Sequence, residues 1–180
     1  MLFRILSVSG SLRFGSSNGT LLAAAARLAP PGVVVESFDR LADIPAFSPD
    51  LEEDSAQLPP AVVHWRHAIG SASALLISSP EYAHGIPGAL KNALDWLVGG
   101  DEIVGKAVGL LNASAVSAFA HPQLVEVLTV MNANIVPEAS VLLDIPRRGM
   151  TVEQILDDPD LTEALRAAIE SLRVVSDKLR

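Results

Sequence analysis

The sequence predicts an α/β fold in which helices cover a parallel β-sheet. Short apolar runs alternate with helix-like patterns along the whole chain, which implies strands joined by right-handed helical crossovers. Two of these runs, Ala74–Ser78 and Ala107–Leu111, are almost continuously apolar, as expected of strands covered on both faces. Aromatic residues make up only 4% of the chain, and Ala, Leu and Val supply the apolar volume that helices packed on a sheet require.

Five segments have the composition of strands. The last of them is interrupted by Pro137, because proline has no N–H to donate to a neighbouring strand. In chain order, the expected strands are Phe3–Ser9, Val33–Phe38, Ala74–Ser78, Ala107–Leu111 and Ile135–Leu143.

Residues that favour a first helical turn mark the predicted helix starts. Prolines suit this position because their missing N–H would have no partner there. These prolines are Pro59, Pro60, Pro87 and Pro122. Asn18 precedes the apolar residues of the first helix, and Asp160 with Glu163 predicts a capping box for the last. Residues 39–60, rich in Pro, Asp, Ser and Glu, are expected to form a surface loop rather than a linker.

Length and composition indicate one globular domain over residues 1–180. Apolar residues make up 49% of the chain and charged residues 19%, which predicts a sizeable core and excludes a disordered chain. The net charge is −8 without a basic cluster, which excludes the usual footprint of nucleic-acid binding. The absence of cysteine excludes disulfides, thiolate metal sites and a cysteine nucleophile, so redox chemistry would require a cofactor.

The sequence predicts a cytoplasmic protein. No apolar segment approaches the roughly 18 residues of a membrane span. The first residues, Met1–Leu6, run directly into the first strand and lack the basic head and cleavage site of a signal peptide.

The segment Ser9–Asn18, after the first strand, has the composition of a phosphate-binding loop. It combines glycines, hydroxyls, an amide and the Arg13 guanidinium with the start of a helix, whose free N–H groups favour an anion. One arginine suits a monophosphate, and the loop lacks both the Lys-Ser/Thr ending of triphosphate loops and the three-glycine dinucleotide fingerprint. The alternative is that Ser17 or Asn18 only caps the helix.

The loop after the third strand is predicted to hold a flat ligand. Two prolines and two glycines between Pro80 and Gly88 stiffen it and bring its backbone close to a neighbour. Its exposed N–H and C=O groups could bind the edge of a planar heterocycle. Alternatively, Tyr82 is a packing residue and His84 an ordinary loop histidine. Trp96 is expected in the core or in a subunit interface.

The segments GSLRFGSSN (residues 10–18) and PEYAHGIPGALKNALDW (residues 80–96) resemble the paired signatures of the NADPH-dependent FMN reductase family, which includes bacterial quinone, chromate and azo-dye reductases. With the order of strands and helices, the resemblance covers nearly the whole chain. It implies a flavodoxin-like three-layer sandwich, with five parallel strands in the order 2-1-3-4-5 and FMN bound non-covalently between the first and third strands. It also implies hydride transfer from NADPH or NADH through flavin N5 to a quinone or a similar acceptor, such as a flavin, azo or metal-oxyanion compound. Members of the family form homodimers or homotetramers.

The resemblance further implies which residues hold the flavin. For the phosphate these are Ser11, Arg13, Ser16, Ser17 and Asn18. For the isoalloxazine they are Pro80, Glu81, Tyr82, Ala83 through its backbone, His84 and Ser114. The helix Leu90–Trp96 is expected to pack across subunits.

The chain departs from the family pattern in two loops. Ala83 stands where Asn usually follows Pro-Glu-Tyr, so Ala83 can bind the flavin through its backbone but not through a side-chain amide. The loop 112–121 lacks the usual glycines, and Phe119 and His121 build a bulkier wall there. The second departure affects the choice of substrate more than flavin binding.

The sequence assigns no catalytic residue. Glu81 and His84 could donate a proton to a bound quinone, or Glu81 could orient the loop while His84 contacts solvent. We expect no metal site, because His64 and His67 have no carboxylate nearby at ligand spacing.

Two other functions remain compatible with the sequence. A flavodoxin-type FMN electron carrier would use the charge of −8 to dock to a basic protein partner. A sensor would use the first loop for another phosphorylated ligand. Neither alternative requires a small-molecule substrate.

Overall fold

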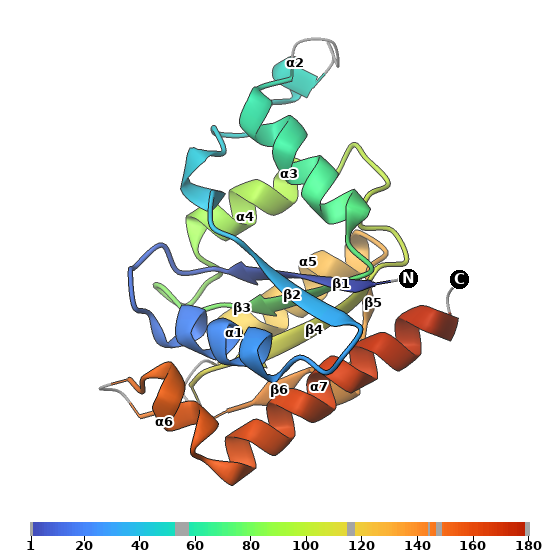
Figure 1. Ribbon diagram of the computed structural model, residues 1–180. Coiled ribbons are helices and arrows are strands. Elements are labelled where there is room, and N and C mark those ends of the chain that lie inside the picture. Colours follow the sequence, from blue (N-terminus) through green and yellow to red (C-terminus); the bar gives the residue numbers. More distant parts are fainter. Residues whose placement is uncertain (1, 53–57, 115–117, 144, 147–148, 179–180) are drawn as a thin grey trace.

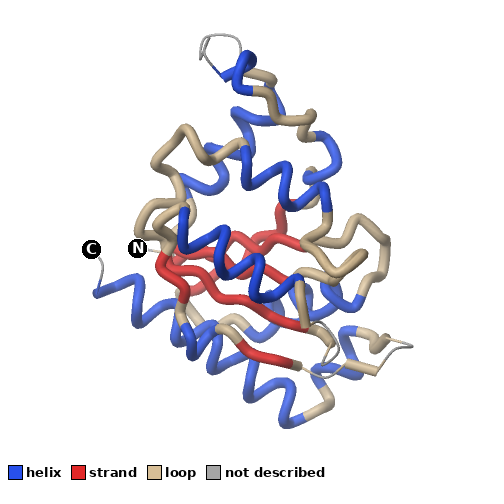
Figure 2. The backbone as a smooth tube through the Cα atoms, turned by 180° about the vertical axis from the view of Figure 1, so that it is seen from behind, coloured by secondary structure: helices blue, strands red, loops and turns tan. Residues whose placement is uncertain are grey.

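The apolar run near the start of the chain forms β1 (Phe3–Ser9), which pairs in parallel with β2 (Val33–Phe38) on one side and β3 (Ala74–Ser78) on the other. β4 (Ala107–Asn112) pairs with β3, giving the order β2-β1-β3-β4-β5, and helices lie on both faces (Figures 1 and 2). The computed structural model describes residues 2–52, 58–114, 118–143, 145–146 and 149–178. The predicted α/β fold and strand order are confirmed.

The outer edge of the sheet beside β4 is split between two short strands. β5 (Asn134–Ile135) and β6 (Val141–Leu142) both pair with β4, and the 3-10 turn η3 (Pro137–Ala139) separates them. The predicted fifth strand is therefore two strands, and its interruption at Pro137 is confirmed. The turn packs tightly on β4, because a Cβ added to Gly109 would lie only 2.8 Å from the carbonyl oxygen of Ala139.

One helical layer is formed by α1 (Ser17–Leu28), α6 (Val152–Leu156) and α7 (Pro159–Lys178), and an apolar core lies between these helices and the sheet. The predicted capping box at Asp160 and Glu163 is wrong. Asp158 Oδ1 accepts the N–H groups of Asp160 and Leu161 at 3.1 and 3.0 Å and thereby caps α7. A capping box does occur, but at Thr151 and Gln154, where it opens α6.

The other layer consists of α3 (Pro60–Ser71), α4 (Gly88–Asp95) and α5 (Ala120–Val130), which enclose the second apolar core. Both indoles are buried there, and their N–H groups find carbonyl acceptors at 2.8 Å, Trp65 at Ala93 and Trp96 at Pro45. The apolar side chains of the helix Leu90–Trp96 therefore pack inside the chain, and packing of this helix across subunits stays a prediction. Leu90, Leu94 and Trp96 are at most 1% exposed within the chain itself.

Between β2 and α3, the described residues form a surface excursion with two short helices, η1 (Leu41–Asp43) and α2 (Pro49–Glu52) (Figure 1). Arg66 of α3 anchors it by pairing with Glu52 at 3.4 Å, and it also pairs with Glu102 at 2.7 Å. No helix among the described residues has the length and apolar character needed to cross a membrane.

Candidate functional site

The carboxyl ends of β1, β3 and β4 lie at one edge of the sheet. The strand order reverses there, because β2 lies on one side of β1 and β3 lies on the other. In open parallel sheets, ligands bind at this point. A cavity of about 300 Å³ lies there, and we call it the central cavity. It is lined by Ser17, Asn18, Ser79, Pro80, Glu81, Asn112, Ala113, Ser114, Ile145 and Pro146.

The β1–α1 loop presents a helix start and one guanidinium to this edge. Ser16 is the N-cap of α1, and its Oγ accepts the N–H of Gly19 at 3.1 Å. Arg13 is exposed, and its backbone N–H donates to Ser11 Oγ at 3.3 Å. Free N–H groups at a helix start favour an anion, and Arg13 belongs to the same loop. Ser16 caps α1, so the alternative interpretation, in which Ser17 or Asn18 caps this helix, is wrong.

The predicted phosphate residues divide between two neighbouring cavities. Ser17 and Asn18 line the central cavity. Ser11, Arg13 and Ser16 line a second cavity of about 410 Å³, which extends along the same loop toward the end of β2. The loop therefore presents polar groups on both of its sides.

The loops after β1 and β3 touch behind the central cavity. Ser78 Oγ donates to Asn18 Oδ1 at 2.9 Å in a buried hydrogen bond, and the N–H of Gly10 donates to the carbonyl of Ser78 at 2.8 Å. A Cβ at Gly10 would lie 2.5 Å from Ser79 Oγ, so glycine is needed for this approach. The two loops are fixed relative to each other before any ligand binds.

A tight two-residue turn projects from the loop after β3. The N–H of Tyr82 donates to the carbonyl of Gly85 at 3.1 Å, and the reverse bond is 3.0 Å long. Ala83 and His84 between them have φ values of 49° and 59°, the left-handed conformation that a type I′ turn requires at both positions. Tyr82 is half exposed, and its hydroxyl lies 3.3 Å from Ser11 Oγ.

Glu81 connects the loop after β3 to the start of α5. Its Oε2 accepts the N–H groups of Phe119 and Ala120 at 2.7 and 2.9 Å. Of the two interpretations from the sequence, the structure supports Glu81 as the residue that orients the loop. The sequence contains no signal for this pairing, because the two backbone N–H groups lie 38 and 39 positions further along the chain.

His84 does not only contact solvent. Its ring stacks on that of Phe119, with centroids 4.3 Å apart and planes 23° apart. Its carbonyl accepts a hydrogen bond from Gln123 Nε2 at 3.0 Å. The bulkier wall expected from Phe119 is therefore joined to the loop after β3.

The loop after β4 closes the remaining side of the central cavity. Ser114 lies in the lining, and its backbone N–H donates to Asn112 Oδ1 at 3.1 Å. Residues 115–117 of this loop lie outside the described residues. Beyond them, partial burial lowers the pKa of His121 in the first turn of α5.

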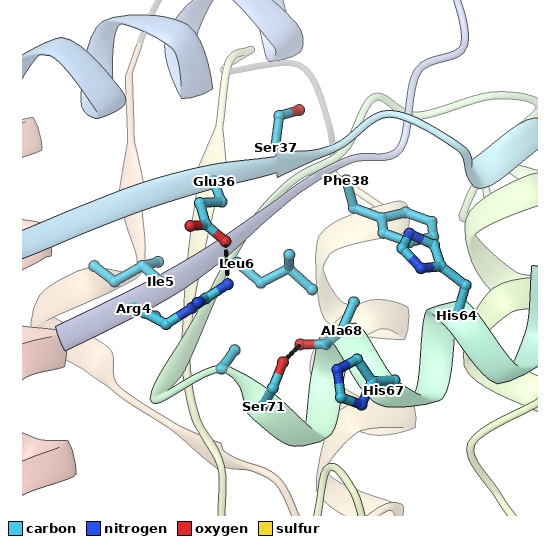
Figure 3. A pocket seen from close by; sticks show the side chains of 11 residues that line it. Arg4, Ile5, Leu6, Glu36, Ser37, Phe38, His64, His67, Ala68 and Ser71 are labelled. Carbon is cyan, nitrogen blue, oxygen red and sulfur yellow. Dashed lines mark hydrogen bonds and ion pairs between the residues drawn. The ribbon is translucent and has the colours of Figure 1, made fainter. Parts of the chain in front are cut away.

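A further cavity of about 210 Å³ lies away from these loops, between β1, β2 and α3 (Figure 3). Arg4 and Glu36 form an ion pair of 2.6 Å on one side of it, and His64 stacks on Phe38 with centroids 5.6 Å apart. His67 also points toward this cavity (Figure 3). Within the described part of the chain, no three His, Asp or Glu side chains are placed to hold a metal ion.

The donor set at the carboxyl edge fits FMN. A helix start, hydroxyls and Arg13 suit a phosphate, and the central cavity beside them is walled by backbone and small polar side chains from three loops. The glycine-tight approach of Gly10 to Ser79 keeps the loops close enough for one ligand to touch both.

Comparisons with known proteins point to one family. The sequence model of the NADPH-dependent FMN reductase family matches residues 3–146. An NAD(P)H-dependent FMN reductase of Pseudomonas aeruginosa is 32% identical over 98% of this chain and 97% of that protein. A probable NADPH:quinone oxidoreductase of Oryza sativa is 32% identical over 98% of this chain and 90% of that protein. The fold matches the flavoenzyme NAD(P)H:(acceptor) oxidoreductase FerB of Paracoccus denitrificans with a TM-score of 0.77 at 24% identity, covering 98% of each chain.

Proposed function

The chain belongs to the NADPH-dependent FMN reductase family, and we propose that it uses FMN to pass electrons from NADPH or NADH to a quinone or a similar small acceptor. The observation that supports this activity best is the central cavity, where the loops after β1, β3 and β4 meet beside the start of α1. A flavin enzyme of this kind needs a held cofactor and a shaped acceptor site more than it needs acid–base residues.

The β1–α1 loop would hold the FMN phosphate. Exposed N–H groups at the start of α1 and the Arg13 guanidinium favour a dianion there, and hydroxyls on both sides of the loop add neutral hydrogen bonds. The residues assigned to the phosphate are Ser11, Arg13, Ser16, Ser17 and Asn18.

The loops after β3 and β4 would hold the isoalloxazine. Bound there, FMN supplies the centre that takes a hydride from reduced nicotinamide and passes two electrons to the acceptor. The protein contributes stacking surfaces, backbone donors and the exclusion of water. The residues assigned to the ring are Pro80, Glu81, Tyr82, Ala83, His84 and Ser114.

The absorption spectrum after incubation with FMN and desalting tests the proposal. Near-stoichiometric flavin that bleaches on addition of NADPH or NADH, and regains its colour with 1,4-benzoquinone, is the expected result. A protein that retains no flavin would contradict it. Arg13→Ala should weaken FMN binding, because it removes the guanidinium from the phosphate site, whereas Arg166→Ala, exposed on α7, is the matched control.

The FMN electron carrier remains the second candidate. Phe14 is fully exposed in the β1–α1 loop and Leu12 is 57% exposed, which suits docking to a protein partner. The same side chains suit the homodimer or homotetramer that we infer for the enzyme. Steady-state oxidation of NAD(P)H with a quinone distinguishes the enzyme from the carrier, and sedimentation velocity measures the assembly. We also infer that the protein works in the cytoplasm.

A further inference from the structure

The loop after β3 and the start of α5 are joined by five residues that we call the rim clasp: Glu81, His84, Phe119, Ala120 and Gln123. Two hydrogen bonds run from the backbone of α5 to the Glu81 carboxylate, at 2.7 and 2.9 Å. One runs from the Gln123 amide to the His84 carbonyl at 3.0 Å. The rim clasp therefore combines backbone and side-chain groups from the loop after β3 and from the start of α5.

The geometry of the turn fixes the His84 ring in this arrangement. His84 has a φ of 59°, and the preceding Ala83 has a φ of 49°, conformations that non-glycine residues adopt rarely. In that conformation, the ring stacks on Phe119 at 4.3 Å between centroids. Stacking of aromatic rings contributes beyond the area that it buries.

The rim clasp borders the central cavity and also faces solvent. Glu81 lines the cavity, whereas Phe119 is 50% exposed and His84 is exposed. The two stacked rings do not line the cavity themselves, but the Phe119 N–H donates to Glu81, which does, so the exposed ring pair lies next to a residue of the cavity wall. Flat, aromatic surfaces favour partners that are themselves flat and apolar.

We propose that the rim clasp sets the choice of acceptor, with Glu81 as a positioning residue and the His84–Phe119 pair as the specificity determinant that favours planar quinones over metal oxyanions. The inference rests on the proposed oxidoreductase function. An oxyanion is held best by lysine and arginine donors, and the clasp contains neither; it carries a carboxylate, a carboxamide, and a phenyl ring with the face of one imidazole stacked on it.

Glu81 acts through α5 in this proposal. The hydrogen bonds from the Phe119 and Ala120 N–H groups both use Oε2 as the acceptor, which is the role of a helix cap. A cap of this kind fixes the first turn of α5, and with it the Phe119 ring on which His84 stacks. Removal of the carboxylate would loosen the wall without removing a proton donor.

Glu81→Gln and Glu81→Ala distinguish a positioning role of Glu81 from a role as proton donor, because glutamine keeps an acceptor oxygen but cannot donate a carboxylic proton. Amide hydrogen exchange of the flavin-free protein should show the Phe119 and Ala120 N–H groups protected in Glu81→Gln and exposed in Glu81→Ala. In the loaded enzyme, Glu81→Ala should raise KM for 1,4-benzoquinone about tenfold and leave the pH profile of kcat unchanged. Glu126→Ala, exposed on the same helix, is the matched control. Equal loss of kcat in both Glu81 variants, with an altered pH profile, would overturn the positioning role.

Phe119→Leu and His84→Ala test the specificity determinant. Each should lower the ratio of kcat/KM for 1,4-naphthoquinone to that for chromate about tenfold. A ratio within about twofold of the wild-type ratio, in variants that still bind FMN, would overturn the inference and leave the oxidoreductase function standing. A wild-type protein that binds FMN but oxidises no NAD(P)H with either acceptor would overturn both.

Discussion

Ser78, the last residue of β3, donates a buried hydrogen bond of 2.9 Å to Asn18, the second residue of α1. The bond joins two strand–helix units on either side of the point where the strand order reverses. Asn18 also lines the central cavity, so this one side chain serves both the fold and the proposed ligand site.

Asn18→Ala should therefore reduce both stability and FMN affinity. The Ser78 hydroxyl, which is 0% exposed, would lose its acceptor, and an unsatisfied buried donor costs about 1–3 kcal/mol of unfolding free energy. Urea denaturation followed by circular dichroism measures this loss. Asn18→Asp keeps the acceptor but adds a negative charge beside the phosphate site, so it should weaken FMN binding more than it reduces stability. Equal FMN affinity in Asn18→Asp and the wild type would argue against a phosphate at this loop.

Gly10→Ala should separate the loops after β1 and β3. The added methyl would lie 2.5 Å from Ser79 Oγ and 3.1 Å from Leu90 Cδ2, and overpacking of this kind costs about 1–3 kcal/mol. Isothermal titration with FMN and a thermal melt measure the effect. Gly88→Ala is the matched control, because a Cβ there meets nothing within 4 Å at the start of α4. An unchanged FMN affinity in Gly10→Ala would show that the close approach of these loops is not needed for the site.

Ala83→Asn should stabilise the protein by about 0.5–1 kcal/mol, because Asn tolerates the left-handed conformation that Ala83 adopts at a φ of 49°. Its free energy of unfolding is measured against that of Ala167→Asn, the same exchange on the exposed face of α7. The exchange in the helix should cost about 0.5 kcal/mol. The prediction fails when both variants change stability in the same direction.

Stability should decline in mild acid partly through His121. Burial lowers its pKa from the ordinary value of 6.5, so the unfolded chain takes up this proton at a higher pH than the folded protein does. The stability that comes from the neutral His121 ring is fully present above pH 6.5 and is lost as the pH falls toward the folded pKa. His121→Gln should flatten the dependence of the unfolding free energy between about pH 7 and pH 5.

The strands could be predicted because their signal is local. β1, β2 and β3 begin and end at the predicted residues, since each is a short apolar run that ends at polar or turn-forming residues. The start of α7 was harder to predict. Asp158 and Asp160 are both suitable N-cap residues, and only the folded chain decides between them. The capping box of Thr151 and Gln154 has the usual spacing, and that spacing could have identified it.

The contacts across the site could not be predicted, because they join residues far apart in sequence. The Glu81 carboxylate binds backbone N–H groups, which every residue except proline carries, so no residue type at positions 119 or 120 signals the contact. Trp96 illustrates the same limit for apolar residues. Its helical spacing predicts a buried face, but only the carbonyl of Pro45 and the core around it show that the burial occurs within one chain.

The placement of the two tryptophans gives the molecule a one-sided optical reporter. Trp65 and Trp96 both belong to the core beneath α3 and α4, whereas the core beneath α1 and α7 contains neither. Indole emission therefore follows one face of the sheet, while far-ultraviolet circular dichroism follows helices on both. Coincident transitions would show a single cooperative unit. An emission change that precedes the dichroism change would identify the tryptophan-bearing face as the first to open.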